Sequence, residues 1–235
     1  MASFLLLHGG QHGPWCWDAV RSILESHGHL VETPDLPGAE GRPVTLDEVA
    51  DAAARGLERL EALRPRVGAY ERPVVVAHSM GGMAAVLLAD RHRARITGLL
   101  CAAAVVPQPG VPVLRDAFGR TGSVLMGALG RPAPIRAVAS YFSGHRLSAA
   151  DRRALLSRLR PEDLSRAGVP FPHYDLAGLR CLYVLATRDR LLRPAIQARF
   201  AARLPGGRVI AVDGGHSVPI EHPTLIAEAA ETLGA

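Results

Sequence analysis

Short apolar runs alternate along most of the chain with longer segments in which apolar residues recur at helical spacing. The apolar runs are typical of buried strands, and they occupy residues 3–7, 73–77, 96–106, 180–187 and 208–212. The amphipathic segments between them include residues 19–28, 45–63, 194–204 and 223–233. Strands that are apolar on both faces and alternate with helices indicate a parallel sheet covered by helices on both sides. The pattern therefore predicts the α/β fold class.

The alternation fails between residues 107 and 176. This stretch contains many prolines and only short helical pieces, at residues 111–119, 122–130 and 148–160. An excursion of this length between two strands is too long for an ordinary connection. We therefore predict a single domain in which residues 1–106 and 177–235 form the core and residues 107–176 form a helical lid.

Composition narrows the class of protein. Hydrophobic residues make up 48% of the 235 residues and charged residues 21%, which is ordinary for a globular protein. All 27 basic residues are arginine, so lysine Schiff-base chemistry is excluded. The arginines are spread along helical segments, and no basic block carries interleaved aromatic residues. We therefore expect no nucleic-acid partner.

The cysteines and the amino terminus bear on location. Cys16, Cys101 and Cys181 are an odd, widely separated set without CxxC spacing, which is typical of buried thiols in a reducing compartment. The first apolar run is too short for a signal peptide or a membrane span. These features favour a cytoplasmic protein with no membrane partner, and they leave a homodimer open.

Ser79 lies where a strand pattern changes sharply into a helix pattern, in the stretch VVVAHSMGGM. Residues Ala77 to Gly81 nearly match the nucleophile elbow G-x-S-x-G, with alanine in place of the first glycine. That position requires a small residue more than a positive φ. In a parallel sheet, ligands bind beyond the carboxyl ends of the strands, where this serine is expected.

A serine nucleophile requires a base, and the base requires an acid that orients it. In folds with this elbow the chain order is serine, acid, histidine. Asp189 follows the predicted strand at 180–187, and His216 follows the strand at 208–212. Asp175 is the rival acid, because Asp213 is only three residues from His216. Alone, each residue could instead be a helix cap, a surface acid or a loop histidine.

The reaction also requires amide donors for an oxyanion. The candidates are the amide of Met80, directly after the serine, and that of Gly10 in the loop after the first strand. His8 and His12 in the same loop could be taken as a metal pair. They lie in a glycine loop without an acidic partner, so we predict no metal site and no cofactor.

Together these stretches resemble the α/β-hydrolase fold family, and within it the plant-type methylesterase and hydroxynitrile lyase branch. The similar stretches are LLLHGGQHGPWCWDAV, VVVAHSMGGM, AAAVVPQPG, LATRDRLLRPAIQARFA and GGHSVPIEHPTLIAE. The resemblance implies about six parallel strands. Lyases of this branch have a threonine and a lysine where this chain has Gly9 and Ser217, so the resemblance favours an esterase.

The predicted lid is expected to determine the substrate. Its candidate lining residues are Phe118, Leu125, Met126, Leu129, Tyr141 and Phe142. Gly9 and Trp15 near the first loop are further candidates for substrate binding. For these lid residues and for Trp15, packing inside the protein is the competing interpretation. A mostly apolar pocket is the inference.

The sequence therefore predicts a cofactor-free serine hydrolase that acts on a small to medium, largely apolar ester or lactone. One alternative keeps the triad for non-hydrolytic chemistry, such as cyclisation, elimination or acyl transfer on a polyketide-like intermediate. Another is a non-catalytic receptor for a small molecule.

Overall fold

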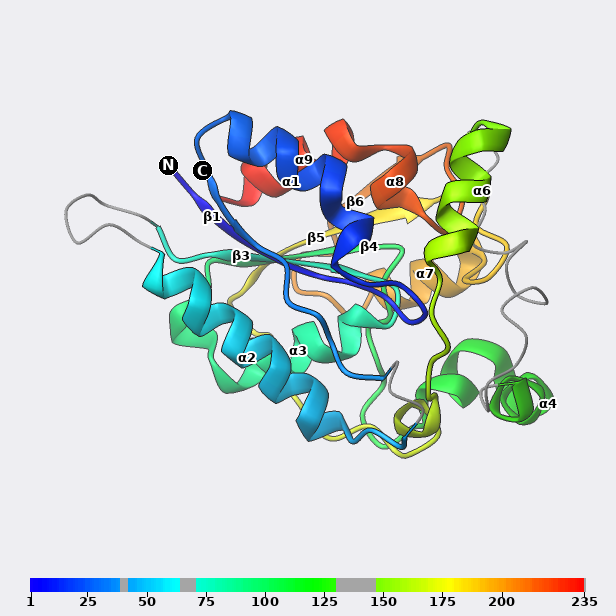
Figure 1. The fold of residues 1–235 in the computed structure, drawn as a ribbon. Coiled ribbons are helices and arrows are strands. Elements are labelled where there is room, and N and C mark those ends of the chain that lie inside the picture. The colour runs from blue at the N-terminus through cyan, green and yellow to red at the C-terminus, as the bar shows by residue number, and fades with distance from the viewer. Residues whose placement is uncertain (39–41, 64–70, 130–146, 235) are drawn as a thin grey trace.

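The described residues of a computed structural model, 1–38, 42–63, 71–129 and 147–234, contain a six-stranded sheet with helices on both faces (Figure 1). The strands are β1 (Ser3–Leu7), β2 (Leu30–Glu32), β3 (Val74–His78), β4 (Gly98–Ala102), β5 (Arg180–Ala186) and β6 (Val209–Val212). They lie in the order β2-β1-β3-β4-β5-β6, and every neighbouring pair is parallel. The parallel sheet predicted from the apolar runs is confirmed.

Helices cover both faces of the sheet. One face carries α1 (Asp18–Ser26), α8 (Val218–Glu221) and α9 (Pro223–Gly234), and the other carries α2 (Leu46–Ala62), α3 (Gly81–Arg91) and α7 (Pro194–Ala201) (Figure 1). Successive residues of a strand point to opposite faces, so each strand serves two cores. In β1, Leu5 and Leu7 pack with α2 and α3, whereas Phe4 and Leu6 pack with α1 and α9.

The described part of the stretch between β4 and β5 contains helices joined by irregular segments. It contains α4 (Val113–Leu129), α6 (Ala149–Arg158) and the short 3-10 helix η3 (Ser165–Ala167). Gly119, with φ of 70°, interrupts α4, so that helix consists of two pieces joined at a kink. Figure 1 shows α4 and α6 beyond the end of the sheet where the strands finish. We call residues 107–176 the insertion.

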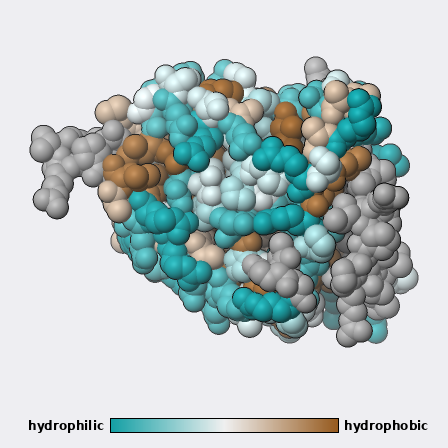
Figure 2. Space-filling model, in the orientation of Figure 1, coloured by the Kyte–Doolittle hydropathy of each residue, from teal (hydrophilic) through white to brown (hydrophobic). Residues whose placement is uncertain are grey.

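Two further 3-10 helices complete the described elements: η1 (Pro14–Trp17) follows the loop after β1, and η2 (Arg93–Arg95) precedes β4. No helix among the described residues is long and apolar enough to cross a membrane. The visible surface in Figure 2 is mostly hydrophilic, with hydrophobic side chains beside α6 and α8. A groove near this part of the molecule is lined by residues that include Trp15, Leu147, Leu155 and Ile220.

The three cysteines are free thiols inside the protein. Burial raises the pKa of Cys101 well above its usual value and that of Cys181 to about 12. Both thiols therefore stay protonated and act as small apolar side chains at neutral pH.

Candidate active site

Ser79 occupies a strained turn between β3 and α3. Its φ is 51°, in the left-handed region that residues with a side chain rarely adopt. Its carbonyl oxygen accepts hydrogen bonds from the amides of Gly82 at 3.1 Å and Val105 at 2.9 Å, which hold the turn from two sides. The serine is buried yet borders a pocket, so its hydroxyl can meet a ligand while its backbone stays fixed.

Glycines allow this turn to approach its neighbours. A Cβ at Gly81 would lie 2.5 Å from the carbonyl oxygen of Leu7, and one at Gly82 would lie 2.0 Å from that of Val105. Gly9 lies behind the serine, where a Cβ would come within 2.6 Å of the Ser79 Cβ. The pattern of small residues in the sequence thus has a direct steric cause.

The structure brings Ser79, His216 and Asp189 together. His216 Nε2 lies 2.9 Å from Ser79 Oγ, and His216 Nδ1 lies 2.7 Å from Asp189 Oδ2. A carboxylate accepts but cannot donate, so Nδ1 carries the ring proton and Nε2 accepts the serine O–H. The histidine and aspartate side chains are fully buried. This is the arrangement of a base that can activate a serine.

Asp189 is held by donors on both of its oxygens. The amides of Leu191 and Leu192 donate to Oδ1 at 2.8 and 2.9 Å. Gln197, fully buried on α7, directs Nε2 at Asp189 Oδ2, 3.1 Å away, and its Oε1 accepts the amide of Ala186 at 3.0 Å. These contacts fix the carboxylate in the plane that faces His216.

The rival acids lie elsewhere. The Asp175 side chain is 73% exposed and pairs with Arg93, and the Asp213 side chain is 49% exposed and pairs with Arg188. Each of these two carboxylates thus faces an arginine near the surface. Geometry therefore favours Asp189, as the order along the chain predicted.

His78 and His12 lie beside His216 and are fully buried. His78 Nε2 donates to the carbonyl oxygen of His216 at 2.8 Å, which ties the loop of the base to the nucleophile turn. Burial, reinforced by the nearby histidines, lowers the pKa of His78 well below its usual value. Burial also lowers the pKa of His12 to about 3. The two rings are therefore neutral at neutral pH.

Gly10 and Met80, the two predicted oxyanion donors, both line the pocket beside Ser79. A Cβ at Gly10 would lie 2.8 Å from the Met80 sulfur, so a larger residue there would have to displace the flexible Met80 side chain. Both backbone segments therefore border the pocket at Ser79, and their role as an oxyanion hole stays a prediction.

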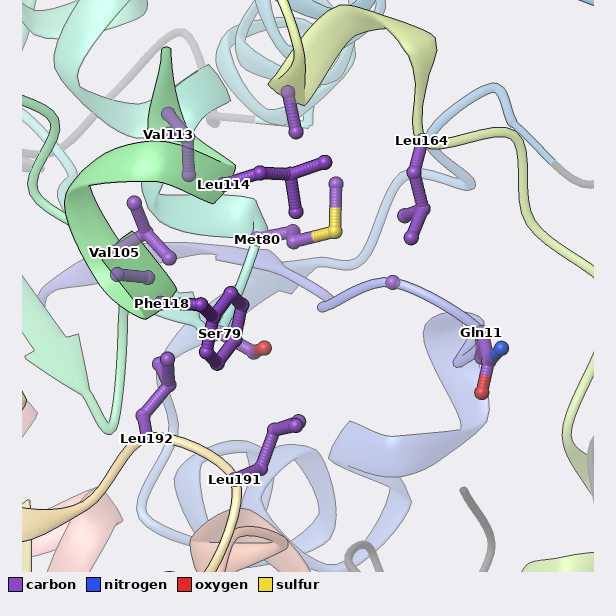
Figure 3. Close-up of a pocket in the computed structure, with 13 residues that line it drawn as sticks. Gln11, Ser79, Met80, Val105, Val113, Leu114, Phe118, Leu164, Leu191 and Leu192 are labelled. Carbon is purple, nitrogen blue, oxygen red and sulfur yellow. The ribbon is translucent and has the colours of Figure 1, made fainter. Parts of the chain in front are cut away.

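The pocket at Ser79 has a volume of about 80 Å³ and is almost entirely apolar (Figure 3). Among the described residues it is lined by Gly10, Gln11, Ser79, Met80, Val105, Val113, Leu114, Ala117, Phe118, Leu164, Ala167, Leu191 and Leu192. None of these carries a charge. By the same measure one water molecule occupies about 10–15 Å³, so the pocket admits a small organic group.

The residues predicted to bind substrate lie in different parts of the structure, and only some of those that the structure describes line the pocket at Ser79. Phe118 lines the pocket, as expected. Gly9 lies behind Ser79 rather than in the lining, and Trp15 lines the separate groove beside α6, where Arg158 stacks over its ring at 4.7 Å. Met126 lies on α4 with its side chain outside the described residues, as Leu125 and Leu129 do, and Tyr141 and Phe142 lie wholly outside them.

Several lining residues were not predicted from the sequence. Leu191 and Leu192 follow Asp189 directly, so an apolar pair next to a candidate triad acid was an available signal. Leu164 and Ala167 come from the end of the insertion and carry no such signal. To predict that Gln11 lines the pocket would have required knowledge of the backbone conformation.

The predicted absence of metal at His8 and His12 remains a prediction, but the expected lack of an acidic partner is wrong for His8, whose Nε2 lies 3.1 Å from Asp35 Oδ1. Each ring also has a backbone contact: His8 Nδ1 faces the carbonyl oxygen of Gly9 at 2.9 Å, and His12 Nδ1 that of Gly10 at 2.9 Å.

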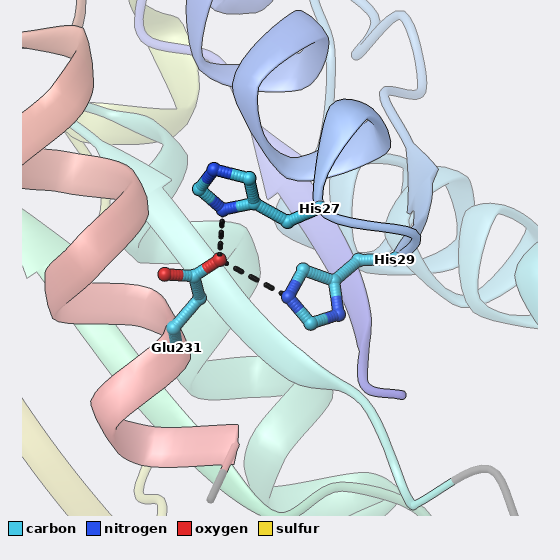
Figure 4. Close-up of side chains that lie close together, drawn as sticks. All are labelled: His27, His29 and Glu231. Atoms are coloured by element: carbon cyan, nitrogen blue, oxygen red, sulfur yellow. Dashed lines mark hydrogen bonds and ion pairs between the residues drawn. The ribbon is translucent and has the colours of Figure 1, made fainter.

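A second cluster, formed by His27, His29 and Glu231, brings three possible ligand atoms within 4.8 Å of one another (Figure 4). The Ala2 amide donates to His29 Nδ1 at 3.1 Å, so the proton of the neutral ring is on Nε2. That nitrogen faces Glu231, and this arrangement suits a hydrogen bond better than a metal.

The parallel sheet, the serine turn and the paired histidine and aspartate together define an α/β hydrolase. In a comparison with known protein families, residues 4–229 match the alpha/beta hydrolase family, so the chain belongs to that family.

Named relatives include esterases. The chain is 35% identical to Methylesterase 7 of Arabidopsis thaliana over 109 residues, which cover 46% of this chain and 42% of that protein. It is 28% identical to a carbendazim hydrolyzing esterase of Nocardioides sp. (strain SG-4G) over the full length of both. The similarity thus reaches less than half of the plant enzyme but all of the bacterial one.

The solved structures agree on the fold. An extracellular alpha/beta-hydrolase from a Paenibacillus species superposes with a TM-score of 0.80 at 20% identity, covering 100% of this chain and 99% of that chain. The α/β-hydrolase fold and the similarity to the methylesterase branch, both predicted from the sequence, are confirmed.

Proposed function

We propose that the protein is a serine esterase that hydrolyses a small to medium, largely apolar ester or lactone. The observation that carries the proposal is the contact of His216 with both Ser79 and Asp189, at 2.9 and 2.7 Å, at the wall of an apolar pocket. The names of the relatives, a methylesterase and a carbendazim hydrolyzing esterase, support ester cleavage.

In the proposed mechanism His216 Nε2 takes the Ser79 proton while Oγ attacks the ester carbonyl. The amides of Gly10 and Met80 stabilise the oxyanion, and Asp189 stabilises the imidazolium. The imidazolium then gives its proton to the leaving alkoxide, and the C–O bond to the alcohol breaks. Water activated by the same ring hydrolyses the acyl-enzyme and returns the proton to Ser79. The reaction requires no cofactor.

The apolar lining supports an uncharged substrate group. Burial of a charged group without a partner would be costly, and no charged side chain among the described lining residues compensates for it. We propose that a short alkyl or aryl acyl group fills the pocket.

Labelling with a small fluorophosphonate tests the nucleophile without knowledge of the substrate. Intact-mass analysis is expected to show one adduct on the wild-type protein and none on Ser79→Ala. The same pair is then compared on 4-nitrophenyl esters and lactones, and Ser79→Ala is expected to lose turnover while its circular dichroism spectrum stays unchanged.

Other outcomes separate the alternatives. Conversion of a polyketide-like substrate that survives in Ser79→Ala would indicate non-hydrolytic chemistry. Tight binding of an ester or acid by an unlabelled wild-type protein, without turnover, would indicate a receptor. Either result would replace the esterase proposal.

A further inference from the structure

Gln11, directly after the predicted oxyanion donor Gly10, has a strained backbone. Its φ is 61°, in the left-handed region that glycine tolerates and other residues adopt at a cost. Such a conformation persists only where the surroundings hold it. The structure therefore requires a source of restraint at this position.

The insertion supplies that restraint from both sides of Gln11. The amide of Gln11 donates to Glu162 Oε2 at 2.9 Å, and its carbonyl oxygen accepts the amide of Arg160 at 2.8 Å. The Arg160 guanidinium also donates to the carbonyl oxygen of His12 at 2.8 Å and to Asp35 at 2.9 Å. Residues of the insertion, about 150 residues away in the sequence, thus hold the loop after β1 through hydrogen bonds.

The Glu162 side chain is buried in the protein interior. Its side chain and that of Arg166 are each 5% exposed, and Arg166 donates to Glu162 Oε1. Gly38 leaves room for the carboxylate, since a Cβ there would overlap its oxygen. Because Arg166 holds one oxygen, the other is fixed toward the Gln11 amide. A carboxylate acceptor makes a stronger hydrogen bond than a neutral one.

We propose that Glu162 is a positioning residue for the oxyanion hole. By accepting the Gln11 N–H it holds the left-handed turn that directs the Gly10 amide toward the pocket beside Ser79. The insertion then contributes to the rate of the chemical step in addition to lining the pocket. This inference rests on the proposed function, because it requires an oxyanion at Gly10.

The first test is the rate of fluorophosphonate labelling of Ser79 in Glu162→Gln. A glutamine whose oxygen faces Arg166 presents its NH₂ to the Gln11 amide, so the acceptor is lost while the side-chain shape stays. Displaced donors lower the rate of reactions through an anionic transition state, so labelling is expected to slow by about tenfold or more. With an ester substrate the loss is expected in kcat rather than in KM.

Glu61→Gln is the matched control. Glu61 at the end of α2 binds Arg95 of η2 through both carboxylate oxygens, at 3.1 and 2.6 Å, near the start of β4 and far from Ser79. Glu61→Gln therefore weakens a Glu–Arg pair without changing any contact of the loop after β1. Its labelling rate is expected to match that of the wild type, even where its melting temperature falls.

Replacement of Gln11 tests the strain itself. Gln11→Gly and Gln11→Ala both remove the side chain, but only glycine adopts positive φ without cost. The effect of Glu162→Gln is expected to be smaller in the Gln11→Gly background than in the Gln11→Ala background. Equal effects in the two backgrounds would contradict the proposed restraint.

The outcomes are distinguishable. An unlabelled wild-type protein would overturn the proposed function and this inference with it. A labelled wild type with an unchanged rate in folded Glu162→Gln would overturn only the inference. If Glu162→Gln fails to fold, Glu162→Asp replaces it, because the shorter side chain keeps the charge for Arg166 but withdraws the acceptor from Gln11. Glu162→Asp is expected to show the same loss of labelling rate. An unchanged rate in this variant would overturn the inference.

Discussion

Burial separates the roles of the histidines around Ser79. His216 contacts a carboxylate that can stabilise its charged form, whereas the rings of His12 and His78 lie at hydrogen-bond distance from backbone oxygens. Burial lowers the pKa of both of these rings, in His12 to about 3. At neutral pH they add no positive charge beside His216, so that ring keeps its ability to accept the Ser79 proton.

The same burial predicts sensitivity to acid. The unfolded chain takes up a proton at His12 near the ordinary pKa of 6.5, whereas the folded protein does so only near 3. The stabilising contribution of the neutral ring is therefore complete above about pH 6.5 and is lost as the pH falls toward 3. His78 acts in the same direction. Urea unfolding is expected to show a stability loss on the order of 1 kcal/mol per pH unit for each ring.

His12→Gln isolates one of the two contributions. Its stability is expected to depend less steeply on pH between 6 and 4, by about one proton. His173→Gln, at an exposed position, serves as the control and is expected to keep the wild-type slope. Equal slopes in the wild type and His12→Gln would show that the ring is not a neutral buried group.

At this scale the sequence was informative where chemistry depends on residue type and order. Ser79, Asp189 and His216 follow separate strands, and parallel strands bring their carboxyl ends to one edge of the sheet. The strain at Gln11 and the buried contact of Gln197 with Asp189 depend on backbone angles and on side chains from other segments. No local pattern encodes them.

At the scale of elements, the strand-turn-helix unit β3–α3 depends on close backbone contact. Gly82→Ala is expected to destabilise the protein by about 1–3 kcal/mol, because the new Cβ would lie 2.0 Å from the carbonyl oxygen of Val105 and force the backbone to move. The same movement displaces Ser79, so labelling by fluorophosphonate is expected to slow. Thermal unfolding and labelling rates measure the two effects.

Gly206→Ala separates crowding from backbone strain. Gly206 has φ of 79°, and a Cβ there would meet nothing within 4 Å. Its replacement is expected to cost about 1 kcal/mol through the left-handed backbone alone and to leave the labelling rate unchanged. If Gly82→Ala were no worse than this variant, tight packing at the elbow would not be the reason for its glycine.

Strand ends show where hydrophobic patterns mislead. The apolar run at 96–106 is longer than β4, because Ala103, with φ of 44°, ends the strand and turns the chain toward the pocket. The strand β2 is also short, since Pro34 and Pro37 after it cannot donate to a ladder. Hydrophobicity predicts burial well, but backbone angles decide where a strand stops.

At the scale of the whole molecule, the pocket is assembled from segments that are distant along the chain. Gly10 and Gln11 come from the loop after β1, Ala117 and Leu164 from the insertion, and Leu191 from the loop after β5 (Figure 3). The sequence predicted an apolar pocket but not its walls, because the position of the insertion depends on tertiary contacts such as that of Glu162 with Gln11.

Because the insertion forms part of the pocket wall, a substitution there is expected to alter the preference for substrate size without altering the chemistry. Ala117, 6% exposed on α4, lines the pocket, so Ala117→Phe would fill much of its volume of about 80 Å³. The preference for 4-nitrophenyl acetate over the hexanoate, measured as the ratio of kcat/KM values, is expected to rise by about tenfold or more. Val169→Phe, at a position of the insertion that is 46% exposed, is expected to leave the ratio unchanged. An equal loss for both esters in Ala117→Phe would mean that the acyl group lies outside this pocket. That result would contradict the proposed binding mode, in which the acyl group fills the pocket.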